Sequence, residues 1–173
     1  CLQAALNPPA ADKREIQWGE RLFRTGDRIM QTKNNYNVVW EKADGTVGTG
    51  MFNGDVGRIV EIDPSGELLV VNFDDRIATY TLDMLNEIDL AYAMTVHKAQ
   101  GSEYQCVVLA AMPAAPSLMV RGVLYTALTR ARELLIVVGD DAAIRAMAAN
   151  DRQQRRYSGL RWRLAHFADP AER

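Results

Sequence analysis

Short apolar runs alternate with polar turn residues from about residue 23 to residue 87. Turn signals such as Asn53-Gly54 and Asp63-Pro64-Ser65-Gly66 separate these runs. Short strands with turns between them predict a small β domain of the barrel type, with or without a ligand of its own. The predicted strands are residues 28–31, 58–62, 68–73 and 76–80, and residues 81–85 are predicted to form one helical turn.

The hydrophobic period changes at residue 88. Apolar runs at residues 88–94, 105–112 and 133–138 predict buried strands, and residues 118–132 carry an apolar stripe with helical spacing. A further helix is expected at residues 142–149, with Asp140-Asp141 as its cap and Asn150 at its end. Strands that alternate with helices indicate a parallel or mixed sheet covered by helices.

The two ends of the chain are more polar. Residues 1–20 contain Pro8-Pro9 and a charged run, which predict an exposed connector, and Leu2 and Leu6 indicate a short helix before Pro8. The last 23 residues, 151–173, carry a cluster of arginines that either contacts DNA or forms the solvated face of a helix; the pattern favours the helix, with its apolar side packed inward. The arginines are Arg152, Arg155, Arg156, Arg161 and Arg163, and the apolar residues are Leu160, Leu164 and Phe167.

Composition limits the class of protein. With 173 residues, 48% apolar and 24% charged, the chain suits one ordinary or two small globular domains. No signal peptide is visible in its first residues and no apolar run approaches the roughly 20 residues that span a bilayer, so no membrane partner is expected. The absence of a disulfide framework fits a cytoplasmic protein. Because the chain does not start with Met, it is expected to begin inside a longer protein.

Cysteine and histidine usage argues against a metal site. The two cysteines form no disulfide framework, and Cys106 is predicted to be a small core residue. The two histidines, His97 and His166, have no cysteine partners at zinc spacing. The net charge of −2 is unusual for a nucleic-acid-binding protein, because contacts with phosphates favour basic surfaces.

One stretch turns from apolar to polar where a predicted strand ends. Its sequence is Ala91-Tyr92-Ala93-Met94-Thr95-Val96-His97-Lys98-Ala99-Gln100-Gly101-Ser102-Glu103. Polar groups at the end of a strand, with a glycine to turn the backbone, suit a ligand site at the edge of an α/β sheet. On spacing alone, a solvated loop explains the stretch equally well.

This stretch resembles the fifth conserved motif of superfamily 1 helicases, in the form found in RecD-like enzymes. Residues Val123–Arg132 resemble the sixth motif and follow at the spacing that this family requires. The likeness extends from about Phe23 to about Asn150. The chain is therefore similar to the C-terminal part of a RecD-like DNA helicase, a type related to the alpha subunit of exodeoxyribonuclease V.

The resemblance implies an α/β fold, namely part of the second RecA-like motor domain with a small SH3-like β-barrel inserted into it. The barrel would occupy residues 21–87 and the RecA-like domain residues 88–150. Residues 1–20 would connect to a missing upstream domain, and residues 151–173 would form a C-terminal helical tail. The implied function is ATP-dependent 5′–3′ DNA unwinding, with single-stranded DNA and the upstream motor domain of the same protein as partners.

The resemblance also assigns a nucleotide side to these motifs. Arg130 matches the arginine that contacts the γ-phosphate, a task that suits a planar, permanently charged guanidinium. Gln100, Gly101 and Glu103 are implied to lie on the same nucleotide side. The alternatives are that Arg130 forms a surface ion pair, for example with Glu133, or that Arg132 is the catalytic arginine.

A second group of residues is implied to contact the single strand: Thr95, His97 and Lys98. The alternatives are a His97 ring bonded to the backbone and a Lys98 amine that is merely solvated. Ala99 stands where relatives often have serine, which removes one hydroxyl from the motif.

The chain can supply only half of an ATP site. A motor of this class needs a phosphate-binding loop, G-x-x-x-x-G-K-[ST], and no glycine here is followed by lysine. ATP and Mg²⁺ are therefore expected to be bound mainly by the missing upstream domain, and the isolated chain is expected to be inactive. A non-enzymatic DNA- or protein-binding module remains the alternative, and a nuclease ranks last because the chain has no carboxylate cluster for two metals.

Overall fold

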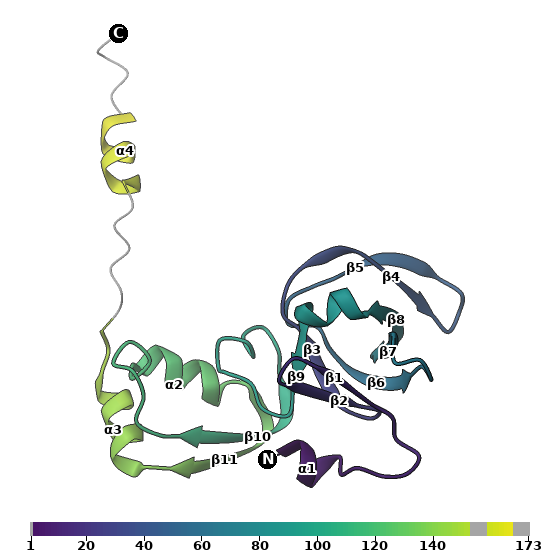
Figure 1. Cartoon of the computed structure of the whole chain (residues 1–173). Coiled ribbons are helices and arrows are strands. Elements are labelled where there is room, and N and C mark those ends of the chain that lie inside the picture. Colours follow the sequence, from purple (N-terminus) through teal and green to yellow (C-terminus); the bar gives the residue numbers. More distant parts are fainter. Residues whose placement is uncertain (1, 153–158, 168–173) are drawn as a thin grey trace. The chain divides into compact units, whose positions relative to one another are not determined.

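The structure is a computed structural model that describes residues 2–152 and 159–167 (Figure 1). The chain forms two compact units, which we call the β unit, Cys1–Ala99, and the α/β unit, Gln100–Arg173. The predicted division lies at residue 88, but Ile88–Leu90 forms strand β9 and pairs with β3 of the β unit. The boundary between the two compact units therefore follows the change of hydrophobic period, because β9 completes a sheet that begins with β3.

Most of the β unit is one seven-stranded antiparallel sheet with the order β5-β4-β8-β7-β6-β3-β9. Figure 1 shows this sheet curling around its core, with the 3₁₀ helix η1, Leu82–Glu87, beside it. The strands are β3 (Arg28–Gln31), β4 (Asn35–Lys42), β5 (Val47–Met51), β6 (Val56–Ile62), β7 (Leu68–Phe73), β8 (Arg76–Thr81) and β9.

The predicted strands 28–31, 58–62, 68–73 and 76–80 are confirmed, and so is the helical turn after them. The pattern does not predict β4 and β5, because asparagines and glycines interrupt their apolar alternation. The predicted barrel is not observed in closed form. The strands β5 and β9 are the edges of the sheet, and no pairing joins them within residues 2–152.

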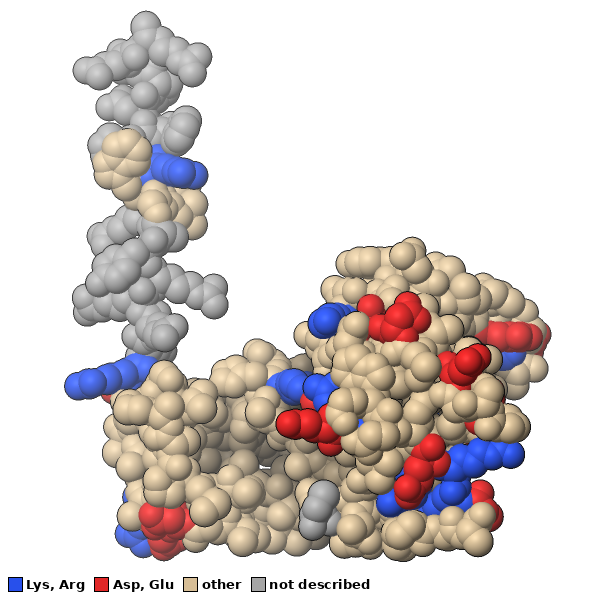
Figure 2. Space-filling model, in the orientation of Figure 1, with Lys and Arg blue, Asp and Glu red and all other residues tan. Residues whose placement is uncertain are grey.

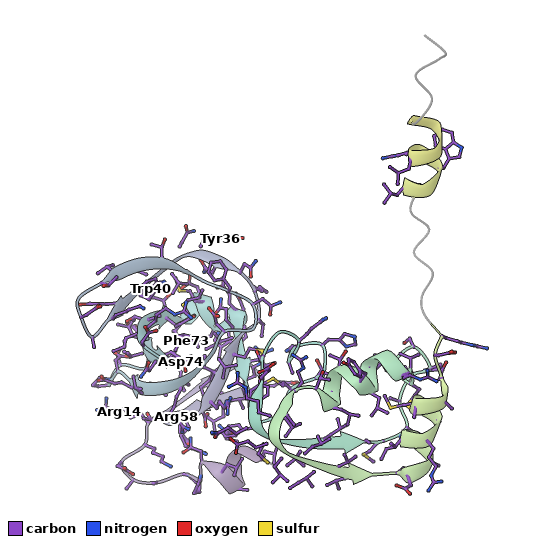
Figure 3. The ribbon with its side chains drawn as sticks, turned by 180° about the vertical axis from the view of Figure 1, so that it is seen from behind. Arg14, Tyr36, Trp40, Arg58, Phe73 and Asp74 are labelled. Carbon is purple, nitrogen blue, oxygen red and sulfur yellow. The ribbon has the colours of Figure 1, made fainter. Side chains whose placement is uncertain are left out.

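Alternation places the core on one face of the strands. In β7 the side chains of Leu69, Val71 and Phe73 are buried while their neighbours are more exposed. Figure 3 shows Phe73 within the curl of the sheet and Tyr36 on its outside. Gly57 is required in β6, because a Cβ there would lie 2.8 Å from the carbonyl oxygen of Asn72. Each large buried side chain contributes roughly 1.5–3 kcal/mol to the unit.

Residues 1–20 are more closely tied to the β unit than an exposed connector would be. The short helix α1, Leu2–Leu6, is present as predicted. Strand β1, Glu15–Trp18, pairs with β2, Arg21–Arg24, in a separate two-stranded antiparallel sheet, and Ile16 is buried. An apolar residue inside the polar run thus anchors the segment.

A buried carboxylate, Asp27, holds these N-terminal residues in place. Its Oδ1 accepts hydrogen bonds from Asn7 Nδ2 and the Tyr92 hydroxyl, both at 2.7 Å. Its Oδ2 accepts from Gln3 Nε2 at 2.6 Å and from the Arg24 backbone N–H at 2.8 Å. Burial, together with the hydrogen bond to Asp27, raises the pKa of the Tyr92 phenol. No pattern in the sequence predicts this four-donor arrangement.

In its described residues, 100–152 and 159–167, the α/β unit contains two parallel strands and three helices. Strand β10, Tyr104–Ala111, pairs with β11, Ala131–Gly139. The helices are α2 (Arg121–Leu128), α3 (Asp141–Ala149) and α4 (Leu160–Phe167). The Asp140 side chain accepts from the Ala142 N–H at 2.8 Å, which confirms the predicted cap of α3, and Asn150 ends this helix.

Helix α2 is shorter than the predicted 118–132, because the chain leaves it at Thr129 to enter β11. Cys106 is exposed, so its prediction as a core residue is wrong. A sheet of two strands has no inner strand, and several apolar side chains of β10 and β11 are likewise exposed, among them Val108, Leu134, Ile136 and Val138.

The tail departs from its prediction as well. Helix α4 is present, but the side chains of Leu160 and Leu164 are exposed and do not pack inward. Arg155 and Arg156, and the side chains of Arg161 and Phe167, lie outside the described residues. No helix among the described residues is long and apolar enough to cross a membrane.

Candidate nucleotide and single-strand sites

The parallel pairing of β10 with β11 brings the two helicase-like motifs together. Tyr104 pairs in register with Ala131, and the Tyr104 N–H donates to the carbonyl oxygen of Arg130 at 2.8 Å. The turn Gly101–Glu103 therefore lies beside the start of β11, although 28 residues separate Ser102 from Arg130 in the sequence. This contact groups the nucleotide-side residues that the sequence predicts.

Arg130 is half-buried and held by acceptors of its own unit. Its Nε donates to the Thr126 carbonyl at 3.0 Å, its Nη1 to the Ser102 carbonyl at 2.9 Å and its Nη2 to Thr129 Oγ1 at 3.2 Å. A guanidinium has five N–H groups, so two are left for a ligand. Among the described residues no carboxylate pairs with Arg130, and the predicted alternative partner Glu133 is exposed without such a contact.

Arg132, the alternative catalytic arginine, is engaged elsewhere. Its Nε lies 2.7 Å from Glu103 Oε2 in an ion pair whose side chains are 66% and 50% exposed. Such surface pairs contribute only about 0–1 kcal/mol and can open when a ligand binds. The sequence pattern does not predict this pair, because Arg132 and Glu103 lie on separate motifs.

The turn before β10 needs its glycine. Gly101 has φ +90°, a conformation that other residues rarely adopt, and no atom blocks the space beside it. Gln100 is exposed at the start of the same turn. The two N–H groups of Arg130 that its three hydrogen bonds leave over can donate to an anion such as a phosphate group. Within the described parts of the chain, no three His, Cys, Asp or Glu side chains come together as a metal-binding group.

The predicted single-strand residues lie at the end of the β unit, in the loop that follows β9. The loop is closed by the Ala99 N–H, which donates to the Thr95 carbonyl at 3.1 Å, and by the Lys98 N–H, which donates to Thr95 Oγ1 at 3.3 Å. Thr95, His97 and Lys98 are exposed. The His97 ring makes no hydrogen bond with the described residues, so the backbone-bonded alternative is not observed.

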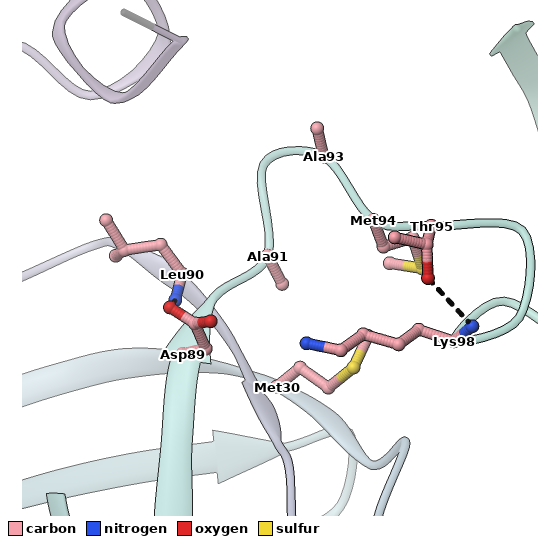
Figure 4. A pocket seen from close by; sticks show the side chains of 8 residues that line it. All are labelled: Met30, Asp89, Leu90, Ala91, Ala93, Met94, Thr95 and Lys98. Carbon is pink, nitrogen blue, oxygen red and sulfur yellow. Dashed lines mark hydrogen bonds between the residues drawn. The ribbon is translucent and has the colours of Figure 1, made fainter. Parts of the chain in front are cut away.

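A pocket of about 300 Å³ lies between this loop and the sheet (Figure 4). Its base comes from the pairing of β3 with β9, in which Met30 stands opposite Asp89. Its other side comes from Met94 and Lys98 of the loop. Met30 and Asp89 are not predicted as site residues, because only the pairing of distant strands brings them to the motif.

The fifth-motif stretch is thus divided between the two units. Thr95, His97 and Lys98 end the β unit, and Gln100, Gly101 and Glu103 begin the α/β unit. On the face shown in Figure 2, basic and acidic side chains are interspersed over the β unit.

Comparison with protein families gives two matches. Residues 1–73 match the SH3 domain of ATP-dependent RecD-like DNA helicases, and residues 90–138 match the UvrD-like helicase C-terminal domain. Both matches are to domains of helicases, and they follow one another along the chain.

Curated relatives agree with this class. The chain is 36% identical over 165 residues to the ATP-dependent RecD2 DNA helicase of Deinococcus radiodurans, covering 95% of this chain and 21% of that protein. It is 34% identical over 150 residues to the RecBCD enzyme subunit RecD of Mycolicibacterium smegmatis, covering 87% of this chain and 24% of that subunit. The chain belongs to the RecD-like helicases, and it spans about a fifth to a quarter of the length of these relatives.

Among solved structures, one of two coordinating Pif1 helicases at forked DNA aligns with 94% of this chain and 40% of that chain. The TM-score is 0.45 and the sequence identity is 17%.

Proposed function

We propose that this chain is the part of an ATP-dependent DNA helicase that contacts single-stranded DNA and completes the ATP site with an arginine finger, Arg130. The observation that carries the proposal is the contact between the two motifs. The Ser102 carbonyl, the Thr126 carbonyl and Thr129 Oγ1 hold the Arg130 guanidinium. Two of its five N–H groups are left for a phosphate. The second RecA-like motor domain would be the α/β unit together with the fifth-motif loop.

The chemistry follows from what a held guanidinium can do. Phosphoryl transfer increases the charge on the transferred group, and a cation that is already oriented stabilises this charge without reorganising. Two carbonyl acceptors fix Arg130 before any ligand arrives, which is the arrangement that such preorganisation requires. The phosphate-binding loop and the magnesium ligands would belong to a motor domain outside these residues, as the greater length of the relatives supports.

The test compares three variants in the full-length protein. We expect Arg130→Ala to lower the DNA-stimulated ATPase rate by about 10³-fold, the low end of the range for arginine fingers. Affinity for nucleotide should change much less, since the lost contact acts mainly in the transition state. Arg130→Lys should not restore the rate, because an ammonium does not reproduce the planar fork.

Arg145→Ala is the matched control. It removes an exposed arginine of α3 that lies outside both motifs and makes only a surface ion pair with Asp141, so the ATPase rate should stay near normal. If Arg130→Ala keeps near-normal turnover at an unchanged melting temperature, the arginine finger is assigned wrongly. If Arg130→Ala unfolds the protein, the three hydrogen bonds of Arg130 are structural and the proposal loses its support.

A further inference from the structure

The pocket below the fifth-motif loop has apolar sides and two polar groups of opposite charge. Met30, Leu90 and Met94 supply apolar surface, and Met30 is almost fully buried. Figure 4 shows the Lys98 side chain lying along Met30, with its amine toward the end of the pocket where Asp89 lies. At about 300 Å³, the pocket is at the lower end of the size range of small-ligand sites.

Both polar groups have capacity for a ligand. Asp89 Oδ1 accepts from the Leu90 N–H at 2.9 Å and lies 3.6 Å from Arg21 Nε, whereas Oδ2 has no partner among the described residues. The Lys98 amine likewise makes no hydrogen bond or ion pair with the described residues. A group that fills the pocket therefore meets one negatively charged acceptor and one positively charged donor.

The apolar lining, together with the Asp89 carboxylate and the Lys98 amine, indicates which class of ligand fits the pocket. A phosphate would lie against the Asp89 carboxylate, which is unfavourable. A neutral, flat group with apolar faces and both donors and acceptors on its edge satisfies all the lining groups, and thioethers such as those of Met30 and Met94 make good contacts with aromatic rings. The edge and faces of a nucleobase have these properties.

We propose that this pocket binds one unstacked base of the single strand, with the base between the methionines and its edge between Asp89 and Lys98. The proposal rests on the proposed single-strand function and adds a base preference to it. An Asp carboxylate accepts from the exocyclic amine of cytosine. Thymine has an oxygen at that position, which would face the carboxylate oxygen, so cytosine is preferred to thymine.

The experiment measures binding of the full-length protein, without nucleotide, to oligo-dC and oligo-dT of equal length at one salt concentration. Homopolymers place the same base in the pocket in every register. We expect about 5- to 10-fold tighter binding of oligo-dC, in the range for one discriminating base contact. Asp89→Asn keeps an oxygen for the Leu90 N–H and puts an amide donor in place of Oδ2, so the preference should reverse toward oligo-dT.

Two further variants complete the design. Glu61→Gln removes the same charge from an exposed position on β6 and should keep the wild-type ratio of affinities. Ala91→Leu adds bulk where the Cβ points into the pocket and should bring the two affinities toward equality.

The outcomes of this experiment separate the base pocket from the proposed single-strand function. A reversed ratio in Asp89→Asn, with an unchanged ratio in Glu61→Gln, supports the base pocket. Equal binding of both homopolymers by the wild-type protein, or the same ratio in Asp89→Asn, overturns the base pocket and leaves the proposed function intact. If the wild-type protein binds neither homopolymer, the proposed single-strand function fails and the base pocket fails with it.

Discussion

Replacing Asp27 should destabilise the β unit, and replacement by alanine should cost more than replacement by asparagine. The carboxylate is fully buried and accepts four hydrogen bonds, two on each oxygen. On each oxygen one donor is buried, namely Asn7 Nδ2 or the Arg24 N–H, and the other is only partly buried, namely the Tyr92 hydroxyl or Gln3 Nε2. The partly buried donors can turn to water, so the two buried donors determine most of the cost.

The magnitude follows from counting those donors. A buried donor without an acceptor costs about 1–3 kcal/mol. Asp27→Ala leaves both buried donors without an acceptor, which predicts a loss of about 2–6 kcal/mol in the free energy of unfolding. Asp27→Asn keeps one oxygen and turns the other into a donor, so only one buried donor loses its acceptor, and a loss of about 1–3 kcal/mol is expected.

The measurement is urea unfolding of the 173-residue chain, followed by tryptophan fluorescence. Trp18 and Trp40 pack against the core of the β unit and report on it. Asp12→Asn, at an exposed position, is the control and should change the free energy of unfolding by less than about 0.5 kcal/mol. An Asp27→Ala variant as stable as that control, or one more stable than Asp27→Asn, would refute the reasoning about unsatisfied buried donors.

Three further predictions concern both units. In the full-length protein, Thr95→Ala and His97→Ala should together weaken single-strand binding by roughly 1–3 kcal/mol, measured by fluorescence anisotropy with an oligonucleotide at fixed salt. Unchanged affinity in both variants would show that these exposed residues are not part of the site. The isolated 173-residue chain should show no DNA-stimulated, magnesium-dependent ATPase activity, because it has no phosphate-binding loop, and measurable turnover would contradict this. Gly139→Ala should unfold or aggregate the α/β unit, since a Cβ there would lie 1.9 Å from the Ala111 carbonyl oxygen; a circular-dichroism melt like that of the wild type would show that the strands can separate without cost.

The sequence alone was sufficient wherever the information is local. Alternation predicts β7 and β8, and side-chain chemistry predicts the Asp140 cap of α3. Each of these features depends on neighbours within a few positions, and period, capping and turn rules describe such neighbours directly.

Tertiary structure decided which of these elements meet. The same short apolar run at residue 88 suits either unit, and only its hydrogen bonds with β3 assign it to the β unit. The four donors on Asp27 and the contact of Ser102 with Arg130 join residues that are far apart in the chain. A periodic pattern states which face of a strand is apolar but not which strand lies beside it. The pocket and the held arginine therefore follow from long-range pairing, which the sequence pattern does not encode locally.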